Sequence, residues 1–378
     1  MRTELARRGT DERIRRLHVG AWITAQCLAV GLFLGGSSAA QAASIPVRVV
    51  VVTTFELGQD SGDTPGEFQA WVERLPLTDT IDFPYGVRAL RYNPALQVLG
   101  VVTGGGAINA AASIMALGLD TRFDLSKAYW IVAGIAGVDP NHGSVGSAAW
   151  AQWVVDRDLT HEIDAREIPQ DWSTGLVPLS RSRPFEAPVP GPGIFTPNVY
   201  HLNPGLTEWA YRLTQGVPLE DTAELRQIRA RYPDQAPAQA PPHVLKGDEV
   251  SAMNWWLGTM MTRTAADWMA YWTGGKGVSV MTAMEDSGIL HALQRLAKTG
   301  RADMNRVLVL RTAANYSAPA KGESAAQLLA SESSSDTATK LSAYGAALEA
   351  AYRVGSKVVQ TLSAHWEQYA GQPPEGTP

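Results

Sequence analysis

The chain has 378 residues, of which 45% are hydrophobic and 18% are charged, and its formal net charge is -5. This is a globular composition, with enough length for one large α/β domain or two modest ones. The sequence contains no basic patch and no charge run, which argues against nucleic acid as a partner.

The first 42 residues differ in character from the rest of the chain. Several arginines precede an apolar run from Val19 to Leu34, and Ala40-Gln41-Ala42 follows. This order is typical of a secretory signal peptide, so we expect cleavage after Ala42 and an exported, periplasmic or extracellular protein. An uncleaved membrane anchor is the alternative. Cys27, the only cysteine, lies in this segment, so the mature chain would have no disulfide.

The mature part of the chain has no apolar run of the roughly 18–20 residues that crossing a bilayer requires. Its longest apolar runs, near 47–55 and 307–310, have the length of strands. We therefore do not expect this chain to carry a solute through lipid by itself.

The predicted elements begin with a β-branched run over 45–54, which indicates a strand buried on both faces. A second strand over 96–103 ends in three glycines, and an Ala-rich helix follows over 107–119. A third strand over 128–133 ends at Gly134-Ile-Ala-Gly137. The order of strand, glycine turn, helix and strand predicts a single α/β domain over 43–366, with a central mixed β-sheet flanked by helices.

The remaining predictions complete this domain. We expect a strand or hairpin over 143–156, a strand from 307, and a disordered tail over 367–378. Further helices are predicted over 67–75, 206–216, 219–231, 253–272, 281–298 and, as one or two helices, 324–366.

Two sequence motifs point to a family. One is Ala283-Met-Glu-Asp-Ser-Gly288, and the other, at a predicted strand, is Val309-Leu-Arg-Thr-Ala-Ala-Asn315. In residue identity and in chain order they resemble motifs of the nucleoside phosphorylase and nucleosidase superfamily, and most closely those of its purine nucleoside permease branch. The resemblance covers most of residues 45–320. It implies a nucleoside phosphorylase-like fold and a purine nucleoside as the ligand.

The resemblance makes Met284-Glu285 the ribose-binding pair. A carboxylate accepts hydrogen bonds from both vicinal hydroxyls of ribose, so ribose, rather than protein, is the expected partner of Glu285. Asp286 is expected to point elsewhere and to cap the helix. The structural alternative for Glu285 is an exposed acid at a helix start.

Two glycine turns are the next candidates. Gly104, Gly105, Gly106 and Asn109 resemble the superfamily's turn beside the ribose and the nucleophile, although a tight turn alone explains them too. They match a dinucleotide fingerprint poorly, because Asn109 stands where that pattern needs glycine. Gly134 and Gly137 resemble a supporting turn at which a flat ligand approaches backbone closely.

The base would be held by an aromatic side chain and an amide. We expect Trp255 or Trp256, with Trp255 preferred, to cover the purine, although a tryptophan is more often part of a core. Asn315 stands where nucleosidases carry an acid, and an amide can hydrogen-bond the base but cannot protonate it. Arg311 either binds phosphate or braces Glu285, and bracing is favoured.

Glu56 is the candidate for positioning water. Because residues 53–58 contain no arginine to neutralise phosphate, hydrolysis is favoured over phosphorolysis. Inorganic phosphate remains a candidate co-substrate, and no other cofactor and no metal is expected. The acids and His161 of 161–167 fit a subunit-interface loop better than a zinc pattern.

Two functions therefore remain open at this point. One is N-glycosidic cleavage of a purine nucleoside, with Asn315 and Glu56 as catalytic residues. The other is a non-catalytic nucleoside-binding protein that assists a membrane transporter. A homo-oligomer is a candidate assembly for either.

Overall fold

A computed structural model describes residues 44–376 apart from 180, 188–198 and 334–342. The predicted signal peptide and its cleavage site thus lie outside the described residues. Residues 43–378 cluster as one compact unit. None of the described helices is both long and apolar enough to cross a bilayer.

The main sheet has 12 strands within the described ranges, and it is mixed. Its longest path runs β12-β9-β14-β15-β7-β2-β5-β4-β3, with β16 and β8 joined beside β7 and β13 beside β8. The strands of this sheet are β2 (Val49–Thr53), β3 (Asp79–Ile81), β4 (Leu90–Asn93), β5 (Val98–Val102), β7 (Tyr129–Val138), β8 (Ala148–Ala151), β9 (Trp153–Asp156), β12 (Val199–His201), β13 (Val244–Lys246), β14 (Asp248–Ser251), β15 (Ser279–Ala283) and β16 (Val307–Tyr316).

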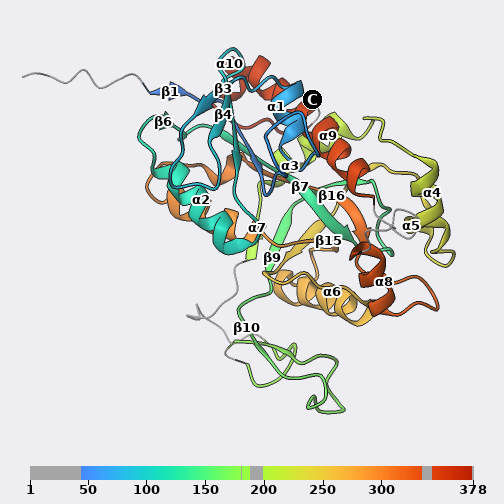
Figure 1. The fold of residues 1–378 in the computed structure, drawn as a ribbon. Helices are drawn as coiled ribbons and strands as arrows, with labels where there is room; N and C mark the ends of the chain where they lie inside the picture. The colour runs from blue at the N-terminus through green and yellow to red at the C-terminus, as the bar shows by residue number, and fades with distance from the viewer. Residues whose placement is uncertain (1–43, 180, 188–198, 334–342, 377–378) are drawn as a thin grey trace, which may run out of the picture. The chain divides into compact units, whose positions relative to one another are not determined.

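Two small sheets stand apart from it. β1 (Ile45–Pro46) pairs with β6 (Phe123–Asp124), and β10 (Thr160–Glu162) pairs with β11 (Leu176–Pro178). The β10 segment contains His161 and extends away from the main sheet (Figure 1).

Helices cover both faces of the sheet (Figure 1). They are α1 (Gln69–Arg74), α2 (Ala107–Leu119), α3 (Pro204–Thr214), α4 (Ala223–Ala230), α5 (Ala236–Gln239), α6 (Thr259–Thr273), α7 (Asp286–Ala297), a 3-10 turn η1 (Met304–Arg306), α8 (Ala325–Ser333), α9 (Tyr344–Ala364) and α10 (Trp366–Tyr369). The predicted α/β domain with a mixed sheet between helices is confirmed.

The alternation of side chains along β2 explains this layering. Val50 and Val52 enter an apolar cluster with residues of α2 and α7, whereas Val49 and Val51 enter a second cluster with residues of α1, α3 and α9. All four valines are fully buried. Successive strand residues point to opposite faces, so an unbroken apolar run requires a helix layer on each side.

Several predicted boundaries are wrong. Residues 281–283 belong to β15 and not to a helix, because Ser279–Ala283 is buried throughout as an inner strand. Residues 253–258 precede α6 as a loop. The predicted disordered tail begins with the short helix α10, and Arg306 donates hydrogen bonds to the carbonyls of Tyr369 and Ala370 at 2.9 Å each.

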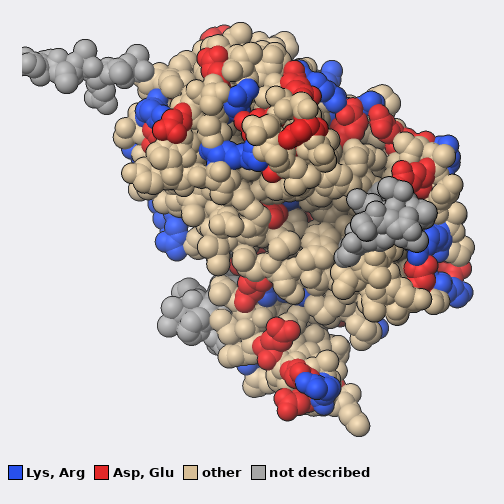
Figure 2. Space-filling view, in the orientation of Figure 1, with Lys and Arg blue, Asp and Glu red and all other residues tan. Residues whose placement is uncertain are grey.

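On the face shown in Figure 2, the basic and acidic side chains of the described residues are interspersed. The two signs alternate there over short distances, and neither gathers over an extended area of that face.

Candidate functional site

The predicted ribose-binding pair lies between a strand and a helix. Met284 and Glu285 connect β15 to α7, and Glu285 is 7% exposed. Its Oε1 accepts a hydrogen bond from the N–H of Gly106 at 3.1 Å, and its Oε2 accepts one from Nη2 of Arg311 at 3.2 Å. The expectation that ribose alone would pair with Glu285 is therefore wrong, because protein donors already hold both carboxylate oxygens.

The glycine turn after β5 lies next to this carboxylate. Gly104 and Gly106 have φ angles of 85° and 83°, which side-chain-bearing residues rarely adopt. A Cβ on Gly106 would lie 3.2 Å from Cε of Met253. Asn109 closes the turn by donating from Nδ2 to the carbonyl of Gly105 at 2.8 Å. The predicted turn and the Met-Glu pair thus meet, with Met253 against them.

The contact between α2 and α7 brings these two segments together. A Cβ on Gly288, in the first turn of α7, would lie 2.1 Å from the carbonyl oxygen of Ala107 at the start of α2. The first turns of the two helices therefore touch, and Figure 1 shows them side by side.

Arg311 braces the acids at the start of α7. Its guanidinium donates to both oxygens of Asp286, at 2.8 and 2.6 Å, and to the carbonyl of Ile135 at 3.1 Å. Its side chain is 1% exposed, and Oε2 of Glu249 lies 3.8 Å from its Nε. In these contacts Arg311 braces buried acids, which is the role that the sequence favoured over phosphate binding. Asp286 was expected to be a cap pointing elsewhere, but it is fully buried and paired with Arg311.

The buried acids differ in how readily they ionise. Burial raises the pKa of Glu249 well above its ordinary value, and the nearby charge of Asp286 adds to this effect. Burial would also raise the pKa of Asp286, but the adjacent Arg311 outweighs it and lowers that pKa. Glu249 therefore ionises less readily than Asp286, whose carboxylate is the one that pairs directly with Arg311.

Glu56 has its carboxylate turned to the backbone. Oε1 accepts hydrogen bonds from the N–H groups of Leu57 and Gly66, and Oε2 accepts from those of Phe68 and Gln69 at 2.8 and 2.6 Å. These four contacts close the loop before α1 and occupy the start of that helix. In this arrangement Glu56 organises the loop.

A second acid, Glu67, was not singled out from the sequence. It is 5% exposed; Oε2 accepts from the N–H and Oγ1 of Thr54 at 2.7 and 2.8 Å, and Oε1 accepts from the N–H of Ile135 at 2.7 Å. Burial raises the pKa of Glu67 to about 7; Arg311 opposes this shift and Glu285 adds to it. Glu67 is thus a buried carboxyl that exchanges its proton near neutral pH.

Gly134 allows these charged groups to approach each other. A Cβ on Gly134 would lie 2.4 Å from Nη1 of Arg311 and 2.8 Å from Oε1 of Glu67. Any larger residue would therefore force the arginine or the acid to move. Gly134 was expected in a turn at a strand end that supports a flat ligand, but it lies within β7, where its lack of a side chain makes room for Arg311 and Glu67.

Gly137 lies among the residues expected to hold the base. A Cβ there would lie 3.5 Å from Cη2 of Trp255 and 3.6 Å from Nδ2 of Asn315. Asn315 of β16 pairs with Gly137 of β7, next to a shift of register between Ala313 and Asn315. Asn315 is 8% exposed, and its Nδ2 donates to the carbonyl of Tyr316 at 3.2 Å.

The two candidate tryptophans have different environments. Trp255 is 39% exposed, whereas Trp256 is 6% exposed and packs in an apolar cluster with Val155 and Trp268. Only the ring of Trp255 thus combines exposure with proximity to Gly137.

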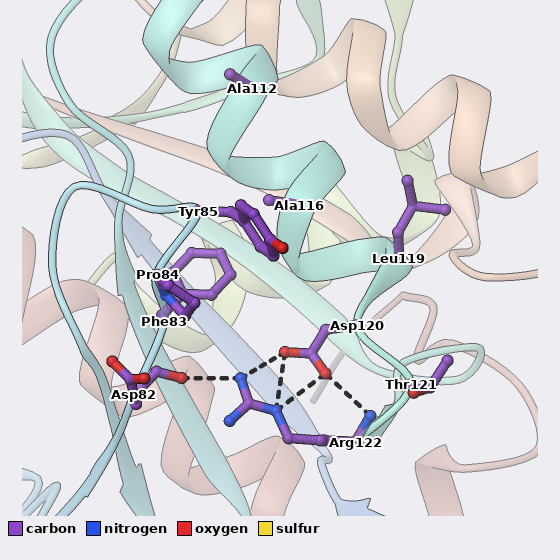
Figure 3. Close-up of a pocket in the computed structure, with 10 residues that line it drawn as sticks. All are labelled: Asp82, Phe83, Pro84, Tyr85, Ala112, Ala116, Leu119, Asp120, Thr121 and Arg122. Atoms are coloured by element: carbon purple, nitrogen blue, oxygen red, sulfur yellow. Dashed lines mark hydrogen bonds and ion pairs between the residues drawn. The ribbon is translucent and has the colours of Figure 1, made fainter.

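A separate pocket of about 770 Å³ lies against the outer side of α2 (Figure 3). Tyr85 and Leu119 line it, and Arg122 bonds there to Asp120 at 2.6 Å and to the carbonyl of Asp82 at 2.8 Å. None of the predicted site residues lines this pocket.

Comparisons with known proteins agree on one family. A model of the purine nucleoside permease family matches residues 46–374. The purine nucleoside permease of Candida albicans is 27% identical over 309 residues, which cover 79% of this chain and 74% of that protein. A probable purine nucleoside permease of Schizosaccharomyces pombe is 30% identical over 283 residues, covering 73% of this chain and 79% of that protein.

Among solved structures, two 5′-methylthioadenosine/S-adenosylhomocysteine nucleosidases are similar. The one from Neisseria meningitidis has a TM-score of 0.45 at 13% identity, over 84% of this chain and 99% of that one. The one from Helicobacter pylori has a TM-score of 0.47 at 11% identity, over 83% and 99%. At these TM-scores the likeness identifies no site residue. The family match over residues 46–374 shows that the chain belongs to the purine nucleoside permease family.

Proposed function

We propose that this protein binds a purine nucleoside beside Glu285, at the carboxyl end of the inner strand β15. We further propose that it cleaves the N-glycosidic bond by hydrolysis. The observation that carries this proposal is the placement of Glu285. Its carboxylate is fixed by Arg311 and Gly106, close to the turn that Met253 covers. The names of the curated relatives support a purine nucleoside as the ligand class.

In this proposal Glu285 accepts hydrogen bonds from the ribose hydroxyls. A carboxylate has about four lone-pair directions, so it can accept bonds from ribose in addition to those from protein. Trp255 stacks on the purine, since an exposed aromatic face next to glycine backbone suits a flat base. Asn315 hydrogen-bonds the base across Gly137.

The proposed nucleophile is water held by an acid. A carboxyl with a pKa near the working pH suits a general base, and the pKa of Glu67 is about 7. Glu56 keeps the indirect role of ordering the loop that carries Glu67. Arg311 is a poor phosphate ligand because acids and a carbonyl occupy its donors, which supports water over phosphate.

A second function has its own supporting observation. The side chain facing Gly137 is the amide of Asn315, which cannot protonate a departing purine as an acid can. The chain would then be a non-catalytic nucleoside-binding protein that presents its ligand to a membrane transporter, as the relatives' name "permease" suggests.

Incubation of the purified protein with inosine, guanosine or adenosine, with and without phosphate, separates these functions. Free base released without phosphate supports hydrolysis, and release that requires phosphate contradicts it in favour of phosphorolysis. Binding with no release contradicts cleavage and supports the second function.

A further inference from the structure

A buried arginine, Arg157, lies at the same ends of the strands as Glu285 and has no role in the proposed function. Arg157 directly follows β9, and its backbone N–H donates to the carbonyl of Ser251 in β14 at 2.9 Å. β14 in turn pairs with β15, which leads to Met284 and Glu285. Arg157 thus lies two strands from the proposed ribose-binding acid, at the matching ends of parallel neighbours.

The guanidinium of Arg157 is short of hydrogen-bond acceptors. It is 5% exposed, and its Nη2 donates to Oδ1 of Asn254 at 2.7 Å. Within the described part of the chain, its buried Nε and Nη1 have no hydrogen-bond partner. A buried charge normally has its donors satisfied, so two unpaired donors on one cation indicate an acceptor other than the described residues.

The surrounding acids supply too little negative charge. Burial lowers the pKa of Arg157, and Asp158 and Glu162 offset this lowering only in part. Asp158 directs its Oδ2 to the N–H of Met253 at 2.7 Å, and burial raises its own pKa. The ring of Trp256 lies 5.4 Å from Cζ of Arg157 and adds weak attraction without accepting those two hydrogen bonds.

The residue that Arg157 binds connects it to the candidate site. Asn254 stands between Met253, whose sulfur lies 3.0 Å from the N of Ala107, and Trp255, whose ring approaches Gly137. The same short loop therefore contacts the glycine turn, the base-side glycine and Arg157. A ligand lying along this loop has the guanidinium within reach of one of its ends.

We propose that Arg157 forms an oxyanion subsite for a phosphate group, carried by the purine nucleoside as a 5′-monophosphate. The fork of an arginine matches phosphate oxygens, and a dianion would supply both the missing acceptors and the missing charge. Free phosphate offers the same chemistry and is the alternative source. This inference rests on the proposed nucleoside site for its location, and on the unpaired donors for its chemistry.

The test uses the whole protein as wild type, Arg157→Gln and the control Arg183→Gln. Arg183 is half exposed and pairs with Asp171, so its substitution removes one positive charge away from the site. Inorganic phosphate is the first probe, measured by calorimetry and by the melting temperature. We expect Arg157→Gln to weaken phosphate binding about tenfold or more, and Arg183→Gln to leave it unchanged.

The unliganded melting temperature separates a ligand role from a structural one. Because the substitution removes an unpaired buried cation, Arg157→Gln should melt at the same temperature as the wild type or higher. A fall in melting temperature with an unchanged response to phosphate would show a structural role and overturn the inference. A wild type that does not respond to phosphate would overturn it as well.

Two further arms identify the source of the phosphate. Wild type that binds inosine 5′-monophosphate more tightly than inosine, with the difference lost in Arg157→Gln, supports the nucleotide. Phosphate-dependent base release that is lost in Arg157→Gln supports free phosphate and contradicts the nucleotide. If inosine is neither bound nor cleaved while phosphate binding still depends on Arg157, the proposed nucleoside site fails and the oxyanion subsite stands.

Discussion

Nη2 of Arg311 lies 3.2 Å from Oε2 of Glu285 while the same guanidinium holds both oxygens of Asp286. The acid proposed to bind ribose is thus fixed before any ligand arrives. Fixing a binding group in advance lowers the entropy lost on binding. The cost is that three buried acids, Glu249, Glu285 and Asp286, lie against a single buried cation.

Loss of that cation should destabilise the fold strongly. Arg311→Met leaves Asp286 and Glu285 buried without their partner, which typically costs about 3–5 kcal/mol of unfolding free energy. Urea unfolding at pH 7 measures the change. As the control, Arg166→Met breaks only an exposed pair with Asp164 and should leave the unfolding midpoint in place. Equal midpoints for Arg311→Met and wild type would mean that the buried network contributes little.

The protonation of Glu67 should appear in the pH dependence of stability. Its pKa is about 7 in the folded protein and 4.5 in the unfolded chain, so the folded protein binds more protons between these values. Stability contributed by protonated Glu67 is therefore present below pH 4.5 and is lost as the pH rises through 7. By linkage the full change amounts to about 3 kcal/mol.

Glu67→Gln should remove this dependence. The unfolding free energy of wild type, relative to the variant, should fall between pH 5 and pH 8, as measured by urea titrations at each pH. The same variant should flatten the pH profile of base release if Glu67 activates water. Parallel pH curves for the two proteins would place the titrating proton on another group.

The side chain of Asn315 should determine which purine nucleosides the protein cleaves. If its amide bonds a 6-oxopurine, Asn315→Asp replaces a donor by a charged acceptor, and kcat/KM for inosine and guanosine should fall about tenfold or more. A gain in adenosine cleavage would instead identify a lost general acid. Asn305→Asp, which alters an exposed amide in η1, away from the proposed site, is the matched control. An Asn315→Asp variant with unchanged binding and cleavage would place the side chain outside the site.

The elements that the sequence predicted well have strong local signals. The helix over 107–119 has the predicted bounds, because the glycines before it adopt φ angles that end the strand and an Ala-rich stretch favours helix. The valine run at β2 can satisfy its apolar side chains only between two helix layers. The motif residues Glu285, Gly106 and Arg311 also come together: Glu285 and Gly106 lie in the segments that follow β15 and β5, and Arg311 lies within β16.

Other features depend on distant contacts and had no local signal. Glu67 lies in a Gly-rich loop whose composition resembles any surface loop, and its partner Ile135 is 68 residues away in the chain. Nothing in the order of residues distinguishes the loop-directed carboxylate of Glu56 from the buried carboxyl of Glu67. The helix expected from 253 begins only after Gly258, whose φ of 121° breaks the run of helix-favouring residues.

The central claim is that Glu285 binds the ribose hydroxyls, and calorimetry with inosine and 2′-deoxyinosine tests it most directly. Wild type should bind inosine about tenfold or more tightly than 2′-deoxyinosine, because a hydrogen bond to a carboxylate is lost with the hydroxyl. Glu285→Gln, checked for an intact melting transition, should bind the two ligands with nearly equal affinity. A preference for inosine that persists in Glu285→Gln, or that is absent from the wild type, would contradict the claim.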